Sequence, residues 1–258
     1  MTKKRYFFIR LILSGIIIGG TIFLLFFNPF FEIQKWEIEE TELIDETEIN
    51  NYLNDFFKSK GGVFPKNNFF VFTIRRQKIS REIEKEFKVI KKASFGFSWD
   101  EKIFKQVSVF LEERKTLGII CPSSDDLSCF FFDKEGFLFK KSPESKGPFI
   151  LKVKNTLEPE LKLGDKIEEP KLIEAITQIE EQVSLNTDLS IREIEIINQN
   201  YDFILHTGNN WKIYFDPKEE IQRQCQVLKT LISEEKVKVN ENIEYIDLRI
   251  KNKAYIKR

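Results

Sequence analysis

The spacing of the apolar residues changes along the chain and separates a continuous apolar run from patterned stretches. Residues 11–31, LILSGIIIGGTIFLLFFNPFF, form 21 consecutive uncharged positions. A helix of this length can cross the ~30 Å hydrocarbon core of a bilayer. Beyond the run, apolar residues recur at every second, third or fourth position, which is typical of half-buried strands and amphipathic helices. The pattern predicts a membrane helix followed by folded domains.

Residues 31–115 combine strand-like and helix-like spacing. A strand is predicted over residues 31–38, with a phase slip as at a bulge. A helix follows from Asp45 or Thr47, either of which can cap it. The order β-α-α-β-β describes one compact α+β domain. Its remaining elements are a second helix that follows the apolar run 69–74 and carries Ile79, Ile83 and Phe87, and strands over 89–97 and 103–113.

From residue 116 onward, short apolar runs are separated by turn signals. One helix is expected over residues 170–183, with proline in its first turn, and another just after Asp216-Pro217. Residues 116–258 therefore predict a mixed β-sheet with flanking helices, and the whole chain falls in the α+β class. The predicted strands before the last are LGIIC, CFFFD, GFLFK, FILKVKN, REIEIINQ, YDFILHTG and NWKIYFD.

The last fourteen residues, YIDLRIKNKAYIKR, alternate apolar and polar positions, broken only at Asn252. They predict one half-buried strand of ~40 Å. An edge strand offers unpaired main-chain groups, so a partner strand can pair with residues 248–257. The basic side chains either attract an acidic partner segment or only protect the edge from aggregation. They are expected to form a stripe on one face: Arg249, Lys251, Lys253 and Lys257.

Charge is balanced overall but unevenly distributed. Lys plus Arg and Asp plus Glu both total 41, so the chain has no basic surplus for nucleic acid. A membrane anchor over residues 6–28 is favoured over a cleaved signal peptide, because the run is long and bulky and lacks a small-residue cleavage site. The positive-inside rule places residues 1–5 in the cytoplasm and everything after about residue 31 outside. It applies because the charged side chains before Glu32 are all basic: Lys3, Lys4, Arg5 and Arg10.

Two of the three cysteines flank a polar loop. Cys121 and Cys129 bracket PSSDDLS between apolar runs, so they can face each other at the base of a hairpin. A disulfide is one interpretation in an extracytoplasmic compartment, and two buried thiols are the other. Cys225 lies in a helical apolar pattern that favours core packing. No cysteine pair has CxxC spacing, so no metal site is predicted.

The sequence contains no recognisable catalytic set. His206 is the sole histidine and alternates opposite Phe203 and Leu205 in its strand, so a surface or rim position is favoured over a catalytic base. Adjacent glutamates in strand or helix ends point to different sides and cannot share a proton. No nucleophile elbow, HExxH zinc motif or phosphate-binding loop occurs. We predict no enzyme activity, no cofactor and no small-molecule substrate, and we expect Gly164 to make a turn.

Four segments carry a resemblance to a known family. FEIQKWEIEE is similar to the opening strand of a POTRA domain, and VSVFLEERKTLGII to the last strand of that domain and the exit from it. FFFDKEGFLF is similar to a strand-turn-strand in which Asp and Gly make the turn, and YIDLR to a closing strand. With the basic tail and single anchor, these segments resemble the bacterial division proteins FtsQ, called DivIB in Gram-positive bacteria. Glu40, Asp100 and Thr116 depart from the Gly, Pro and Pro common there.

The resemblance implies a bitopic scaffold at the division septum. In the family, FtsB and FtsL bind the extracytoplasmic part, which links early and late division proteins and helps control septal peptidoglycan synthesis. The implied plan is a cytoplasmic tail over 1–5, an anchor over 6–28, a POTRA-like domain over 31–115 and a β domain over 116–258. A POTRA-containing envelope chaperone or translocation module is the alternative. The implied partner-binding residues on the terminal strand are Leu248, Arg249, Ile250, Lys251, Tyr255 and Ile256.

Overall fold

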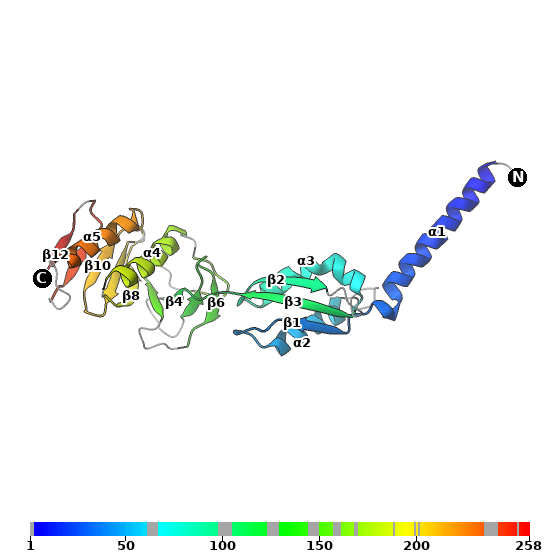
Figure 1. The fold of residues 1–258 in the computed structure, drawn as a ribbon, viewed down its shortest axis with the longest axis horizontal. Coiled ribbons are helices and arrows are strands. Elements are labelled where there is room, and N and C mark those ends of the chain that lie inside the picture. Colours follow the sequence, from blue (N-terminus) through cyan, green and yellow to red (C-terminus); the bar gives the residue numbers. More distant parts are fainter. Residues whose placement is uncertain are drawn as a thin grey trace. The chain divides into compact units, whose positions relative to one another are not determined.

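The chain divides into two compact units, Met1–Glu113 and Arg114–Arg258, and each is considered by itself (Figure 1). An apolar N-terminal helix followed by mixed sheets with helices confirms the α+β class. The computed structural model describes residues 3–60, 67–97, 105–122, 129–143, 150–156, 161–167, 170–187, 189–198, 200, 202–234, 242–251 and 253–258.

The first unit begins with the apolar helix α1 (Lys3–Phe27). Within Tyr6–Phe27, an 18-residue stretch has a mean hydropathy of 2.3 and no buried residue, so α1 is the one described helix with the length and composition to cross a membrane. The Asn28 N–H donates to the Leu24 carbonyl at 3.1 Å. The Asn28 side chain accepts from the Phe30 N–H at 2.9 Å, which caps the short 3-10 helix Pro29–Phe31.

A three-stranded sheet in the order β1-β3-β2 forms the rest of the first unit. β1 runs parallel to β3, and β2 runs antiparallel to it. A parallel pair needs a long crossover, and the two helices between β1 and β2 provide part of it. Trp36 and Phe72 contact each other in the core at 5.4 Å between ring centroids. The elements are β1 (Lys35–Ile38), α2 (Glu46–Lys60), α3 (Phe69–Glu86), β2 (Ile90–Phe97) and β3 (Gln106–Glu113).

Two boundaries of the first unit differ from those predicted. The opening strand covers Lys35–Ile38 and not 31–38, because residues 29–31 are helical. The prediction that the second helix follows the run 69–74 is wrong, since α3 contains the run. Asn68 caps α3 there, because its Oδ1 accepts from the N–H groups of Phe70 and Val71 at 2.9 and 3.2 Å. The Asn68 cap therefore marks the start of α3 at the first residue of the apolar run.

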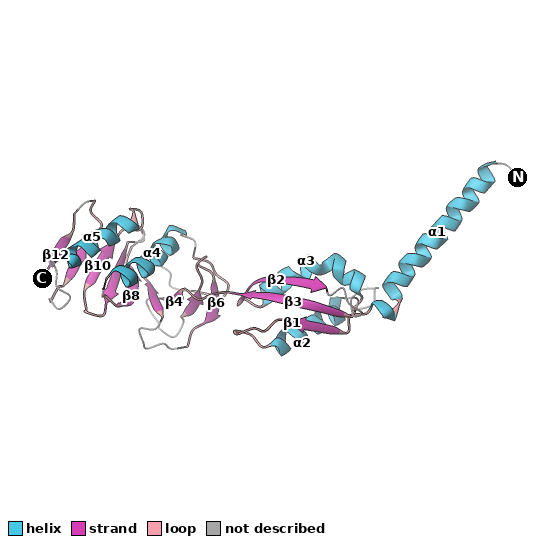
Figure 2. Ribbon diagram, in the orientation of Figure 1, coloured by secondary structure: helices cyan, strands magenta, loops and turns pink. Residues whose placement is uncertain are grey.

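The second unit contains a nine-stranded mixed sheet in the order β12-β11-β10-β9-β8-β7-β4-β5-β6. Helices α4 (Pro170–Asn186) and α5 (Ile221–Ser233) pack together with the sheet around one core, and Figure 2 shows them over the strands. The strands are β4 (Gly118–Pro122), β5 (Phe130–Phe132), β6 (Leu138–Lys141), β7 (Leu151–Asn155), β8 (Ile191–Ile196), β9 (Phe203–Thr207), β10 (Lys212–Phe215), β11 (Tyr245–Asp247) and β12 (Tyr255–Lys257).

The prediction of one long terminal strand is wrong, because the chain turns back and forms the antiparallel pair β11 and β12. The Lys253 N–H donates to the Ile250 carbonyl at 3.1 Å within the turn. The neighbouring strand β10 has only 4 residues, so a strand of fourteen would leave most of its length without a partner. Folding back also places Ile256 opposite Ile246 on the core side of the sheet.

Two turns in the second unit agree with the sequence pattern. Gly136 has φ +77 and Gly164 has φ +92, which are conformations that glycine adopts at little cost. Before Gly136, the Asp133 carboxylate accepts from the N–H groups of Glu135 and Phe137 at 2.9 and 3.0 Å. Arg114 donates to the same carboxylate at 2.6 Å, so the turn between β5 and β6 is tied to the first residue of the unit.

Candidate functional site at the sheet edge

β12 forms one edge of the nine-stranded sheet, and β11 is its only neighbour among the described strands. The Lys257 carbonyl points toward β11, because it accepts from the Glu244 N–H at 2.8 Å. Successive residues of a strand direct their main-chain groups to opposite sides. The N–H and C=O of Ile256 therefore point away from β11, where an additional strand can bind them.

The side chains of β12 lie on two faces of the sheet. Ile256 packs partly buried against the core on the helix side. Tyr255 is 50% exposed. Lys257 pairs with Glu244 at 2.8 Å, and the hydrogen bond that it donates to this carboxylate raises the pKa of Lys257. The edge thus offers main-chain groups together with one aromatic and one partly neutralised basic side chain.

Arg249 is held inside its own unit. Its guanidinium donates to Asp247 at 3.0 and 2.6 Å and to Asp202 at 3.1 Å, and it lies 5.0 Å from the centre of the Tyr214 ring. Burial alone would raise the pKa of Asp247, but the side-chain and main-chain hydrogen bonds from Arg249 and its charge lower it. The hydrogen bond with Asp247 in turn raises the pKa of Arg249. The arrangement orders the end of β11.

The predicted basic stripe is wrong in its geometry. Arg249 follows β11 and is paired with carboxylates, Lys251 and Lys253 lie in and just after the turn, and Lys257 is on β12. These side chains therefore do not follow one strand. The cause is the same reversal of the chain that splits the predicted strand in two.

The remaining predicted contact residues differ strongly in exposure. Leu248 is only 1% exposed and belongs to the core of the unit, so its side chain is not accessible to a partner. Ile250 is 45% exposed in the turn, and Lys251 beside it is exposed. The β12 edge and the preceding turn thus contain Ile250, Lys251, Tyr255 and Ile256. Leu248 packs in the core and stabilises this part of the unit.

A pocket of about 420 Å³ lies beside this edge and was not predicted. Its apolar lining comes from Val227 and Leu231 on α5 and from Ala254 just before β12. The helical spacing of α5 indicated that Val227 and Leu231 share one face of that helix. The pocket forms because this face lies beside Ala254, which the sequence did not predict. The other lining residues are Arg223, Gln226, Thr230 and Lys253.

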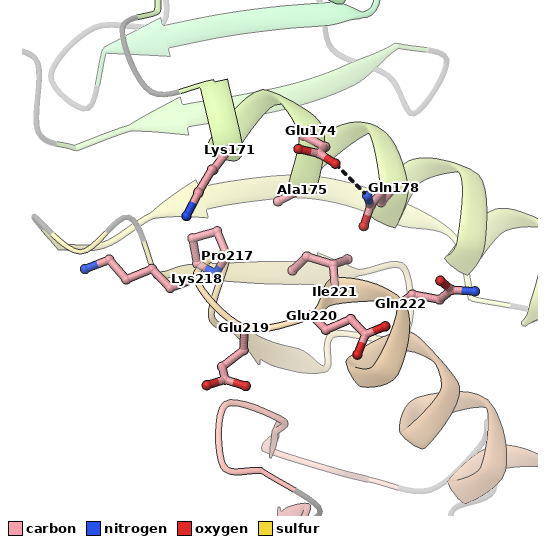
Figure 3. Close-up of a pocket in the computed structure, with 10 residues that line it drawn as sticks. All are labelled: Lys171, Glu174, Ala175, Gln178, Pro217, Lys218, Glu219, Glu220, Ile221 and Gln222. Atoms are coloured by element: carbon pink, nitrogen blue, oxygen red, sulfur yellow. Dashed lines mark hydrogen bonds between the residues drawn. The ribbon is translucent and has the colours of Figure 1, made fainter.

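A second groove lies between α4 and the segment that leads into α5 (Figure 3). Glu174 accepts a hydrogen bond from Gln178 at 3.2 Å on the α4 side, and residues 217–222 form the other side. Lys171 and Glu219 are among its charged residues of both signs. No histidine or cysteine lines the groove, and its charged groups are lysines and glutamates.

The other candidate chemical residues are placed as follows. His206 on β9 is half-buried, with its Nε2 2.9 Å from the Glu195 carboxylate. The Sγ atoms of Cys121 and Cys129 are bonded as a disulfide, and Cys225 is a buried free thiol. Burial raises the pKa of Cys225 to about 12. Among the described residues, no group of three or more His, Cys, Asp or Glu side chains has the geometry to hold a metal ion.

Together, the fold and the site define a class of protein: an apolar N-terminal helix, a small α+β unit, and a larger mixed sheet with β12 at one edge. Residues 126–249 match the family model Cell division protein FtsQ/DivIB, C-terminal. The match spans just under half of the chain and supports its assignment to the FtsQ/DivIB family of cell-division proteins. No curated protein matches the chain. The family match includes the pocket residues of α5 and ends before β12.

Proposed function

We propose that this protein is a non-enzymatic scaffold of the bacterial division machinery and that a small bitopic coiled-coil protein of the FtsB/FtsL type binds its β12 edge. The outward N–H and C=O of Ile256 are the observation that supports this proposal most directly. Strand addition at such an edge derives affinity from main-chain hydrogen bonds and specificity from alternate side chains. The chain links division proteins in this way and so contributes to the control of septal peptidoglycan synthesis.

Two features next to the edge support a specific partner. A side chain of the added strand can enter the pocket lined by Val227, Leu231 and Ala254. Ile250 and Tyr255 provide exposed apolar surface on either side of the turn, and Lys251 favours an acidic group on the partner. Binding therefore combines main-chain pairing, one apolar anchor and a polar rim, as in other specific interfaces.

The proposed location follows from α1 and its charges. α1 crosses the cell membrane once with the basic residues Lys3, Lys4 and Arg5 on the cytoplasmic side. The β-α-α-β-β part of the first unit and the whole second unit then lie outside the cytoplasm, where a partner with its own single span can present its extracytoplasmic segment to β12. The β-α-α-β-β unit acts as a POTRA-like domain that contributes to recruitment at the septum.

The substitution Ile256→Pro tests strand addition, because it removes the outward N–H while leaving the groups that face β11. We expect capture of the FtsB/FtsL-type protein by the full-length chain to fall about tenfold, since a hydrogen bond is lost and the ring blocks pairing. The measurement is co-purification from membranes with equal amounts of scaffold.

Ile256→Ala is the matched control, since it shortens the same side chain and keeps the N–H. It should retain more of the partner than Ile256→Pro, and melting temperatures should show both variants folded. Equal capture by the proline variant and the unmodified chain would exclude strand addition at β12. Broad binding of unfolded clients in place of one partner would indicate an envelope chaperone.

A further inference from the structure

The first unit contains a side chain that joins the end of α1 to the start of α3. The Asn68 Nδ2 donates to the carbonyls of Leu25 and Phe26 at 3.0 and 3.2 Å, while its Oδ1 accepts from the N–H groups of Phe70 and Val71. Asn68 is buried. One amide thus satisfies main-chain groups at the last turn of one helix and the first turn of the next, groups that helix ends otherwise leave unpaired.

Aromatic contacts reinforce this junction. The Phe70 ring lies 6.2 Å from the Phe26 ring and 5.1 Å from the Phe31 ring, measured between centroids. The first turn of α3 is therefore fixed at the end of the apolar helix and does not hang from it by a flexible linker.

This junction sets how far α3 lies from the membrane that α1 enters. Ile74 is six residues beyond Asn68, which is about 9 Å along a helix at 1.5 Å per residue. The head-group layer beyond the hydrocarbon core is roughly 5–8 Å thick on each side. With Asn68 at the end of the span, where it contacts Leu25 and Phe26, Ile74 lies at most about 9 Å beyond the hydrocarbon core, within or just outside that layer.

The exposed side chains at this end of the unit match a lipid interface. Ile74 is 75% exposed and Phe30 is 57% exposed, so both side chains are available to insert into an apolar environment. Lys78 follows Ile74 by one helical turn on the same side of α3, and the Lys105 Nζ lies 5.9 Å from the centre of the Phe30 ring. Lysines in this position can reach lipid phosphates while their alkyl chains cover apolar surface.

We propose that Phe30 and Ile74, held in place by the Asn68 junction, dock the first unit onto the head-group region of the bilayer. Glu32 lies at the same end of the unit, and the proposed interaction combines insertion of the two apolar side chains with the neighbouring lysines. The proposal rests on α1 crossing the membrane and is independent of any partner at β12. Its consequence is that the first unit has a defined orientation on the membrane surface.

The test uses the full chain with Cys225→Ser, reconstituted in vesicles of phosphatidylethanolamine and phosphatidylglycerol. A polarity-sensitive fluorophore is attached at Ile74→Cys, and the matched control is Lys85→Cys, an exposed site about 16 Å further along the same helix. We expect the probe at 74 to be quenched severalfold less by iodide than the probe at 85, and more strongly by nitroxide-labelled lipids. Equal iodide quenching at the two sites would overturn the proposal.

The substitution Asn68→Asp tests whether the hydrogen bonds between Asn68 and α1 are needed to hold position 74 at the bilayer, or whether any residue at this end of the unit is equally protected. The aspartate keeps the oxygen that caps α3 and loses the Nδ2 donor to α1. We expect iodide quenching at position 74 to rise toward the value at position 85. If iodide quenched the probe at position 74 to the same extent in Asn68→Asp, the Asn68 junction would not be what holds Phe30 and Ile74 on the bilayer.

Discussion

Arg249 contacts two carboxylates that are far apart from each other in the sequence. Asp247 precedes it by two residues, whereas Asp202 lies 47 residues earlier. The guanidinium is planar and always charged, so it can bind both carboxylates at once. The three side chains connect the segment before β9 with the end of β11, directly beside the proposed binding edge. At this scale, the basic residue that looks available in the sequence is a structural element of the folded unit.

The Asp247 carboxylate should make stability depend on pH in the acid range. Its pKa is lower in the folded chain than in the unfolded chain, so the unfolded state takes up the proton first. The stabilisation is complete above about pH 4 and is lost as pH falls through the lower folded-state pKa. Melting temperatures between about pH 6 and pH 2 should therefore fall more steeply for the unmodified chain than for Asp247→Asn. Parallel curves would contradict this contribution.

The β11–β12 hairpin is the element that determines which residues a partner can reach. In the antiparallel pair of β11 and β12, Ile246 lies opposite Ile256 and Asp247 lies opposite Tyr255. The two short strands are therefore neighbours in the sheet and do not continue one another. The intervening turn exposes Ile250 and leaves Leu248 in the core. Residues two apart, which a continuous strand would place on the same face, therefore have opposite roles.

Paired substitutions at these two positions test the hairpin. Leu248→Ala should lower the free energy of unfolding by about 2–5 kcal/mol, because it leaves a cavity in the core. Ile250→Ala should change it by less than about 0.5 kcal/mol, as at other exposed sites. Ile250→Glu should reduce capture of the FtsB/FtsL-type partner with little change in stability. Chemical denaturation and co-purification measure the two effects, and equal stability losses at 248 and 250 would refute the observed turn.

At the scale of the whole molecule, α1 and the disulfide point to the same compartment. A helix of this hydropathy fits a single span, and the bond between Cys121 and Cys129 is of the kind that persists in oxidising environments. The family adds a membrane-associated role in division. These features are the basis for the proposal that the second unit lies outside the cytoplasm.

The cysteines provide a direct test of that orientation. Cys121 and Cys129 are buried in the folded chain, so in spheroplasts treated with urea a membrane-impermeant maleimide should label them only when a reductant has opened the disulfide. Cys225 should stay unlabelled in the folded chain, since it is buried and its pKa is raised to about 12. Labelling of Cys121 and Cys129 without a reductant would contradict the disulfide, and mass spectrometry of the peptides distinguishes the sites.

The features that the sequence determined by itself depend on residues close together in the chain. The uncharged run defines α1, Gly136 and Gly164 adopt the turn conformations expected of them, and proline starts α4 where predicted. Each of these follows from local sterics, capping or hydropathy, which act within a few residues. The order of helices and strands as far as α5 was predictable for the same reason.

Only the tertiary structure decided how the C-terminal region is arranged. Alternation showed that Ile246 and Ile256 face a core, but a continuous strand and a hairpin satisfy that pattern equally well. The short neighbour β10 selects the hairpin, because unpaired main-chain groups beyond its end would have no partner. The pairing of Arg249 with Asp202 and the pocket between α5 and Ala254 likewise depend on segments that are distant in sequence. Such contacts form when burial joins whole elements, and the local sequence does not specify them.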